Sequence, residues 1–286
     1  MAIVEAILQG VLLGGLYALF AAGLSLIFGV MRLVNIAHGD LIVLAAYVAY
    51  VIVGLTGLHP ALSLVLVIPI MAVFGYFMQV LLLNRTMGDD ILPPLLVTFG
   101  ISIIIQNSLL TGFSADSLRL PAGNIETQSV QVAGMHLGVL PIFTFAVAFV
   151  LIVALEMLFS RSRVGRAFRA TSDDQEMAAT IGMDNRRIFG MAMALSCAIV
   201  AVAGVLLAMR SNFDPFSGPS RLIYGFEAVI IGGLGSFWGT LIGGIVLGVA
   251  QSLGGQISPS YQILAGHLVF FAILALRPRG LFPKAD

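Results

Sequence analysis

The chain has 286 residues, of which 59% are hydrophobic and only 10% are charged, and its 14 basic residues balance its 14 acidic ones. Soluble domains are about a quarter charged, so this composition excludes an ordinary soluble protein. Basic residues cluster only in short loops, so no nucleic-acid partner is expected. Several apolar runs reach the roughly 20 residues that cross a hydrocarbon core of about 30 Å. The sequence therefore predicts an all-α polytopic membrane protein in a lipid bilayer.

The predicted membrane spans are long apolar runs in chain order. The run at 222–254 is too long for one ordinary span, and its centre, GGLGSFWG, is rich in glycine. It predicts two shorter helices or a re-entrant hairpin, because broken backbone at membrane depth is tolerated only inside protein or beside a water-filled path. We expect about 8–9 transmembrane helices with at least one broken or re-entrant segment. The predicted spans are 4–29, 37–58, 61–83, 91–111, 139–159, 187–209, 222–254 and 259–276.

Basic residues predict the orientation of the spans. Arginines crowd into residues 161–187, and Arg277, Arg279 and Lys284 follow the last span. By the positive-inside rule, both regions are expected in the cytoplasm. The C-terminus is then cytoplasmic, and counting spans backwards places the N-terminus outside. The polar segment 112–138 becomes the longest external loop.

Between the first two spans, the stretch VNIAHGDLIV at 34–43 holds three polar side chains in a short space. Asn35 is able to cap the following helix by accepting from the N–H of Ala37 or His38. Asp40 would then be an acid near the positive end of that helix. We expect this stretch near the cytoplasmic end of the first span.

Small residues recur every four positions in several spans. This spacing lets two helices approach closely, which matters inside a bilayer because the hydrophobic effect does not drive helices together there. The expected role is packing within the chain, and packing against a second membrane subunit is the alternative. The glycines assigned to it are Gly10, Gly14, Gly235, Gly239 and Gly243.

The richest polar segment, residues 160–187, begins with arginines and carries acids in its middle. Ser172 or Asp173 is positioned to cap a short helix through EMAAT, and Gly182 suits the position just after that helix. The result would be a short amphipathic helix on the cytosolic surface. It would either dock into a groove on a soluble partner or serve only as a solvated connector whose charges set the topology.

The residues required for ATP hydrolysis at a P-loop, for metal binding and for serine hydrolase chemistry are absent from the sequence. Lys284 is the only lysine and lies near the end of the chain, whereas a P-loop needs its lysine directly after a glycine-rich turn. No Cys or His cluster has metal-ligand spacing, and no GxSxG elbow is present. We therefore expect no enzymatic activity and no cofactor in this chain.

Six stretches, taken together and in order, resemble the permeases of branched-chain (hydrophobic) amino-acid ABC importers. The segment EMAATIG is also similar to the cytoplasmic EAA-type loop of ABC permeases, although Met177 departs from the usual alanine. The six stretches are GLYAL at 15–19, NIAHGD at 35–40, LVTFGIS at 96–102, GRAFRATSDDQEMAATIGMDNRRI at 165–188, EAVIIGGLGSFWGTLIGGIVLG at 227–248 and RPRGLF at 277–282.

The resemblance implies a single transmembrane permease domain over 1–286 that includes a cytoplasmic coupling loop at 160–187, in a bacterial plasma (inner) membrane. The implied partners are two ABC ATPase subunits that use ATP and Mg, a second homologous permease and an extracytoplasmic substrate-binding protein. In the loop, the residues expected to meet the ATPase are Arg166, Arg169, Asp173, Asp174, Glu176 and Gly182.

The same resemblance gives the polar residues of the spans a second interpretation, as a translocation path or its gate. Ionisable groups inside a membrane are expensive and tend to face cavities or partners. Asn35, His38 and Asp40 are assigned to the gate, and Glu227, at a glycine-rich break, to the border of the path. The expected cargo is a hydrophobic amino acid. Urea or a short amide is the alternative cargo, and a stand-alone secondary carrier is the alternative class.

Overall fold

The computed structural model describes residues 2–88, 90–132 and 134–282. Lys284, expected in the cytoplasmic tail, lies outside them. The described chain is mostly helical, as predicted. Its elements are α1 (Ala2–Met31), α2 (His38–Thr56), α3 (Pro60–Leu81), η1 (Leu83–Arg85), α4 (Leu92–Phe113), α5 (Asn124–Thr127), β1 (Ser129–Val132), β2 (Met135–Gly138), α6 (Val139–Arg161), α7 (Arg163–Asp173), α8 (Gln175–Thr180), α9 (Asn185–Arg210), α10 (Gly218–Gly232), α11 (Phe237–Ile257) and α12 (Tyr261–Leu276).

Within the described residues, 7 helices are long and apolar enough to cross a membrane, and α12 is a shorter apolar helix. The prediction of a polytopic all-α membrane protein with a broken segment is confirmed. The 222–254 run forms the end of α10 and most of α11, separated by a tight turn. Gly233 and Gly235 have φ values of +105° and +80° in this turn, a conformation that side chains disfavour. The break is therefore built into the local sequence.

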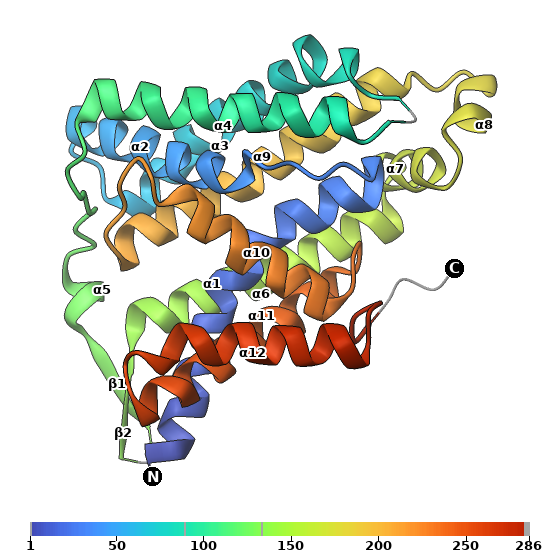
Figure 1. Cartoon of the computed structure of the whole chain (residues 1–286). Coiled ribbons are helices and arrows are strands. Elements are labelled where there is room, and N and C mark those ends of the chain that lie inside the picture. The colour runs from blue at the N-terminus through green and yellow to red at the C-terminus, as the bar shows by residue number, and fades with distance from the viewer. Residues whose placement is uncertain (1, 89, 133, 283–286) are drawn as a thin grey trace.

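Helices α1 and α9 are buried along most of their length and form the centre of the bundle. Helices α3, α4 and α6 expose most of their apolar side chains, as lipid-facing helices do. Figure 1 shows α1 crossing the middle of the molecule, with α4 and α12 at opposite edges. The core thus lies around α1 and α9.

The arrangement of α1–α3 is repeated, inverted, in α9–α11. A Met-Arg pair stands at the end of both α1 and α9, and in each case a non-helical segment leads into the next helix. Helix α1 packs against α10 and α11, and α9 packs in the same way against α2 and α3. Because α1 and α9 run in opposite directions (Figure 1), the two sets have inverted topology, a common plan in transporters.

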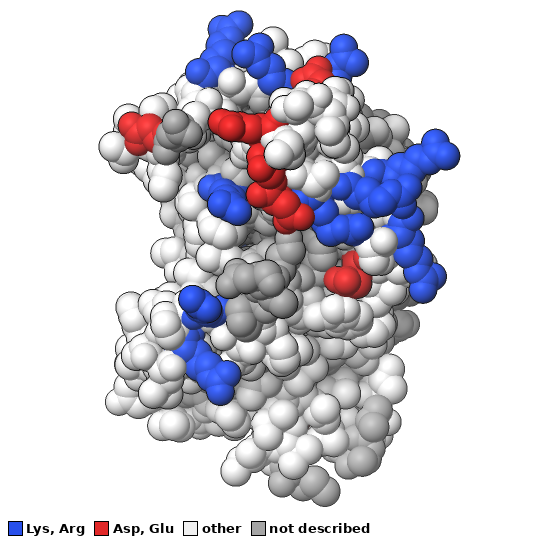
Figure 2. All heavy atoms as spheres, turned by 90° about the vertical axis from the view of Figure 1, so that its right-hand side faces the viewer, with Lys and Arg blue, Asp and Glu red and all other residues white. Residues whose placement is uncertain are grey.

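The two ends of the bundle differ in chemistry. At one end, β1 and β2 form an antiparallel hairpin in the register Ser129↔Gly138, and Leu118 pairs with Phe213. The other end, which we call the arginine-rich face, carries α7, α8, the start of α9, the end of α1 and the described residues 277–282 after α12 (Figure 1). Figure 2 shows acidic side chains among basic ones on this face.

Candidate functional site

The stretch 34–43 lies deeper than predicted. The His38 ring donates through Nε2 to the carbonyl oxygen of Phe20 at 2.9 Å, and Phe20 lies eleven residues before the end of α1 at Met31. At 1.5 Å per residue, this is roughly 16 Å from the end of the helix, about half of a 30 Å hydrocarbon core. The stretch lies at the start of α2, as expected for the second span, but His38 meets α1 about three turns before the end of that helix instead of near it. The chain leaves α1 and turns back into the bundle before α2 begins.

Side chains accept hydrogen bonds from the backbone N–H groups of the non-helical segment between α1 and α2. The Ile36 N–H donates to Thr98 Oγ1 of α4 at 3.3 Å, and the Ala37 N–H donates to Asn35 Oδ1 at 3.0 Å. Asn35 therefore accepts from one of the two groups expected, although the residue directly before α2 is Ala37. Non-helical backbone at this depth needs such partners because no water is present to replace them.

His38 is fully buried at the start of α2. Its Nε2 carries the proton, because the carbonyl oxygen of Phe20 only accepts. The ring fills the space beside Gly23, where an added Cβ would lie 2.7 Å from His38 Cε1. In this structure the imidazole joins α2 to α1.

Asp40 joins α2 to α4. Its carboxylate accepts from Ser102 Oγ at 2.6 Å and from Gln106 Nε2 at 3.0 Å, and the residue is only 2% exposed. The first turns of α2 and α10 also meet here, because a Cβ on Gly39 would lie 2.0 Å from the oxygen of Gly218. Sequence reasoning missed Ser102 and Gln106. Their signal is a polar residue at every fourth position from Thr98 to Gln106, which puts the three on one face of the span.

Glu227 occupies the corresponding place in the inverted set. It is buried on α10 and bonds through Oε1 to His267 Nδ1 of α12, which is partly exposed. In both sets, an acid on the second helix binds a polar side chain on the helix that follows the set in the chain, α4 in one case and α12 in the other. Sequence reasoning did not pair these two residues, which lie forty positions apart.

Glycines make the closest helix contacts. A Cβ on Gly10 would lie 2.6 Å from the Cα of Val249, and one on Gly14 would lie 2.6 Å from the oxygen of Gly244. The partner stripe on α11, formed by Gly244 and Gly248, was missed although it has the same four-residue spacing.

The other predicted glycines divide between two roles. Gly239 and Gly243 lie against α10, where a Cβ on Gly243 would lie 2.0 Å from the oxygen of Ala228. Gly235, in contrast, belongs to the turn before α11. Its predicted place on the packing stripe is wrong, because the helix begins only at Phe237.

The loop 160–187 forms α7 and α8. Asp174 caps α8 by accepting from the N–H groups of Glu176 and Met177 at 3.0 and 2.9 Å. The expected caps, Ser172 and Asp173, instead belong to the last turn of α7, and Ser172 Oγ donates to the oxygen of Gly29 at 2.5 Å. This bond ties the loop to the end of α1.

After α8, Gly182 adopts a φ of +90° and donates its N–H to Ala179 O at 3.0 Å. Arg169 donates to the carbonyl oxygen of Phe159, and Arg166 NH1 lies 3.5 Å from Arg161 O. Both arginines therefore also brace α7 against the end of α6.

Helix α8 presents apolar side chains to the outside. Met177 and Ile181 are 63% and 69% exposed, whereas Ala178 is buried against the body. The side chains of Asp173 and Glu176 are exposed beside them. Across the described residues, no group of three His, Cys, Asp or Glu is placed to hold a metal ion.

Comparisons with known proteins agree with this picture. The chain is 28% identical to the high-affinity branched-chain amino acid transport system permease protein BraD of Pseudomonas aeruginosa, over 99% of this chain and 96% of the relative. It is 28% identical to the permease protein LivH of the corresponding system in Escherichia coli K12, with coverages of 97% and 94%. A probable branched-chain amino acid transport permease protein LivH of Methanocaldococcus jannaschii is 30% identical, with coverages of 86% and 80%.

No solved structure gave a significant match. The family model described as "Branched-chain amino acid transport system / permease component" matches residues 6–276. The match spans the long helices of the bundle, both inverted sets and the loop at 160–187. The chain therefore belongs to the family of permease components of branched-chain amino acid transport systems.

Proposed function

We propose that the chain is the transmembrane subunit of an ATP-driven ABC importer that forms the translocation path for branched-chain and other hydrophobic amino acids. The observation that carries the proposal is the exposed α8, which follows directly after α7 and the bond from Ser172 to Gly29 that ties this loop to the bundle. The named cargo of the relatives supports the choice of amino acids. ATP and Mg belong to two partner ATPases, and a second homologous permease and an extracytoplasmic binding protein complete the assembly.

In this proposal, the arginine-rich face is cytoplasmic and the C-terminus lies on that side. The density of arginines at 161–187 supports this orientation. The apolar side chains of Met177 and Ile181 enter a groove on the ATPase, and Asp173 and Glu176 meet basic groups at its rim. The capped α8 then passes movement of the ATPase through Ser172 to the end of α1.

The gate in this proposal is formed by α2 and α10, the second helix of each inverted set, each of which follows a non-helical segment. Asn35, His38, Asp40 and Glu227 hold the first residues of α2 and the middle of α10 to their neighbours. Transporters commonly place such interrupted helices beside the substrate. Movement of α1 at its cytoplasmic end would reach this site through the bond between His38 and Phe20.

Uptake of labelled leucine tests the proposal. Cells that lack this chain, but contain its ATPase and binding protein, are compared with and without its restoration, and unlabelled isoleucine, valine and urea are added as competitors. We expect restored, energy-dependent uptake that isoleucine and valine block. No restoration of leucine uptake, despite good expression beside the ATPase and the binding protein, would move the cargo to urea or short amides. Uptake without any ATPase would refute the ABC assignment in favour of a secondary carrier.

A further inference from the structure

A cavity of about 560 Å³ opens at the arginine-rich face, between α8, η1 and the ends of α1 and α9. Its apolar lining comes from Met31, Met87 and Phe189. Its polar lining comes from two basic and three acidic side chains, with Asn84 between them. The cavity thus combines an apolar surface with charges of both signs. The charged residues are Arg32, Arg186, Asp173, Asp174 and Glu176.

Most of these charges have no ion-pair partner among the residues that the structure describes. Ion pairs within 4.0 Å among the described residues involve other groups, and only Asp174 uses its carboxylate, as the cap of α8. Arg32, Arg186, Asp173 and Glu176 remain available to a ligand. Arg32 also has a φ of +53°, an uncommon conformation for a residue with a side chain, of a kind that clusters at binding sites.

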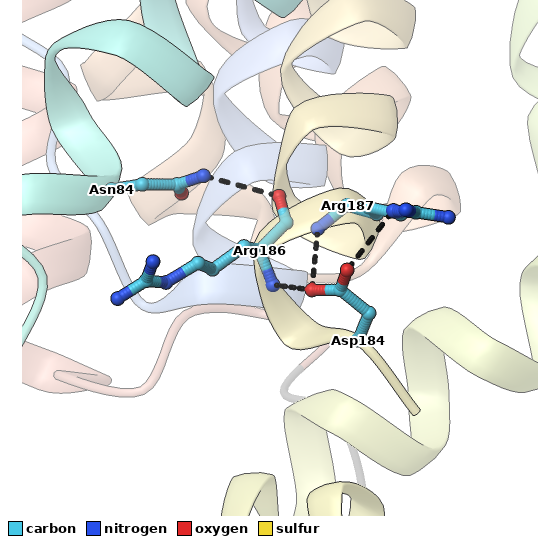
Figure 3. Close-up of polar contacts among 4 residues, drawn as sticks. All are labelled: Asn84, Asp184, Arg186 and Arg187. Carbon is cyan, nitrogen blue, oxygen red and sulfur yellow. Dashed lines mark hydrogen bonds and ion pairs between the residues drawn. The ribbon is translucent and has the colours of Figure 1, made fainter. Parts of the chain in front are cut away.

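One wall of the cavity is held in place by hydrogen bonds. Gln79, which is fully buried, donates to Asn84 Oδ1 at 3.0 Å, and Asn84 Nδ2 donates to the oxygen of Arg186 at 3.2 Å. Figure 3 shows the Arg186 side chain extending toward the Asn84 side, whereas Arg187 points away and pairs with Asp184. Two neighbouring arginines therefore differ in one respect that matters: only Arg186 lines the cavity.

We propose that this cavity binds a free hydrophobic amino acid from the cytoplasm and thereby slows import. The carboxylate of the ligand meets Arg32 and Arg186, and its ammonium group meets Asp173 and Glu176, the two carboxylates for which it then competes with the basic groups of the ATPase. Its side chain covers the apolar surface of the cavity. Such a ligand joins α8 to α1 and α9, and so restrains the segment that must move during transport. The inference rests on the proposed function for the orientation and for the class of cargo.

Binding of labelled leucine to the full chain in lipid nanodiscs tests the site directly. We expect Arg186→Gln and, separately, Arg32→Gln to weaken binding by about tenfold or more, since each removes one charge-assisted contact worth at least about one factor of ten. Arg187→Gln is the matched control and should bind as the unaltered chain does. Leucinamide lacks the carboxylate and 4-methylpentanoate lacks the ammonium group, so each should compete at least about tenfold less well than leucine.

Equal leucine binding by Arg186→Gln and Arg187→Gln would overturn the proposal, because the bound leucine would then lie elsewhere, for example in the translocation path. Loss of ATPase co-purification in Arg186→Gln with unchanged leucine binding would also overturn it, and would assign the cavity to the ATPase.

The effect on transport is measured in cells loaded with leucine beforehand. We expect loading to lower the initial uptake rate of the unaltered chain and of Arg187→Gln, and to lower it much less in Arg186→Gln and Arg32→Gln. The ratio of loaded to unloaded rates within each variant removes any difference in basal activity. If unloaded cells take up leucine but loading affects all variants equally, the feedback site is refuted while the proposed function stands.

Discussion

The close approach of α2 and α10 makes a sharp prediction for Gly39→Ala. The added Cβ would lie 2.0 Å from the oxygen of Gly218, whereas ordinary contacts begin at 3.4 Å. One helix must therefore move by roughly 1.4 Å in a close-packed interior. Overpacking of this kind typically costs about 1–3 kcal/mol. The same helix supplies the control, because a Cβ on Gly54 meets nothing within 4 Å.

Both substitutions gain the same helix propensity, about 1 kcal/mol for replacing glycine by alanine, so their difference isolates the cost of packing. We expect Gly54→Ala to leave the unfolding temperature unchanged or slightly raised, and Gly39→Ala to lower it by several degrees. Thermal unfolding of the full chain in detergent, followed by size-exclusion chromatography after heating, measures both. Equal unfolding temperatures for the two variants would refute the reasoning that the α2–α10 crossing is tightly packed.

Three further predictions follow from single contacts. Asp40→Ala leaves the Ser102 hydroxyl and the Gln106 amide without their acceptor. We therefore expect the free energy of unfolding to fall by about 1–3 kcal/mol per group, which the same thermal assay would detect. An unfolding temperature equal to that of the unaltered chain would contradict this prediction. Asp174→Ala removes the cap of α8, which is worth about 1 kcal/mol, and we expect it to weaken ATPase co-purification. Asp174→Asn keeps the cap and should leave co-purification unchanged. Equal weakening by both variants would mean that the charge of Asp174, and not its capping bond, matters. Gly243→Leu places its side chain against the oxygen of Ala228 and should abolish assembly and leucine uptake, and normal uptake would be incompatible with the α10–α11 packing.

Local features were predictable from the sequence. Apolar length identified the spans, because crossing a bilayer depends on a run of residues rather than on distant contacts. The break between α10 and α11 was predictable because glycine is the residue that tolerates the positive φ values of Gly233 and Gly235. The helix before Gly182 was predictable for the same local reason, although its cap was assigned one or two positions too early.

The position of the polar stretch was not predictable, because it depends on how the chain re-enters the bundle. The topology predicted from the basic residues put residues 34–43 near the cytoplasmic end of the first span. The structure places His38 beside Phe20, and this follows from a non-helical segment whose N–H group bonds to Thr98, 62 positions from Ile36.

By itself, then, the sequence determined the membrane class, the approximate spans, the broken segment and the surface helix of the coupling loop, since each depends on residues adjacent in the chain. Tertiary structure alone decided the partners of Asp40 and Glu227, the match of the α1 glycines to those of α11, and the cavity around Arg186. These features join residues from helices far apart in the chain, and no periodicity within one helix specifies which neighbour it meets. The physical reason is that helix packing in a membrane is chosen by the fit between surfaces, and that fit exists only once the helices are side by side.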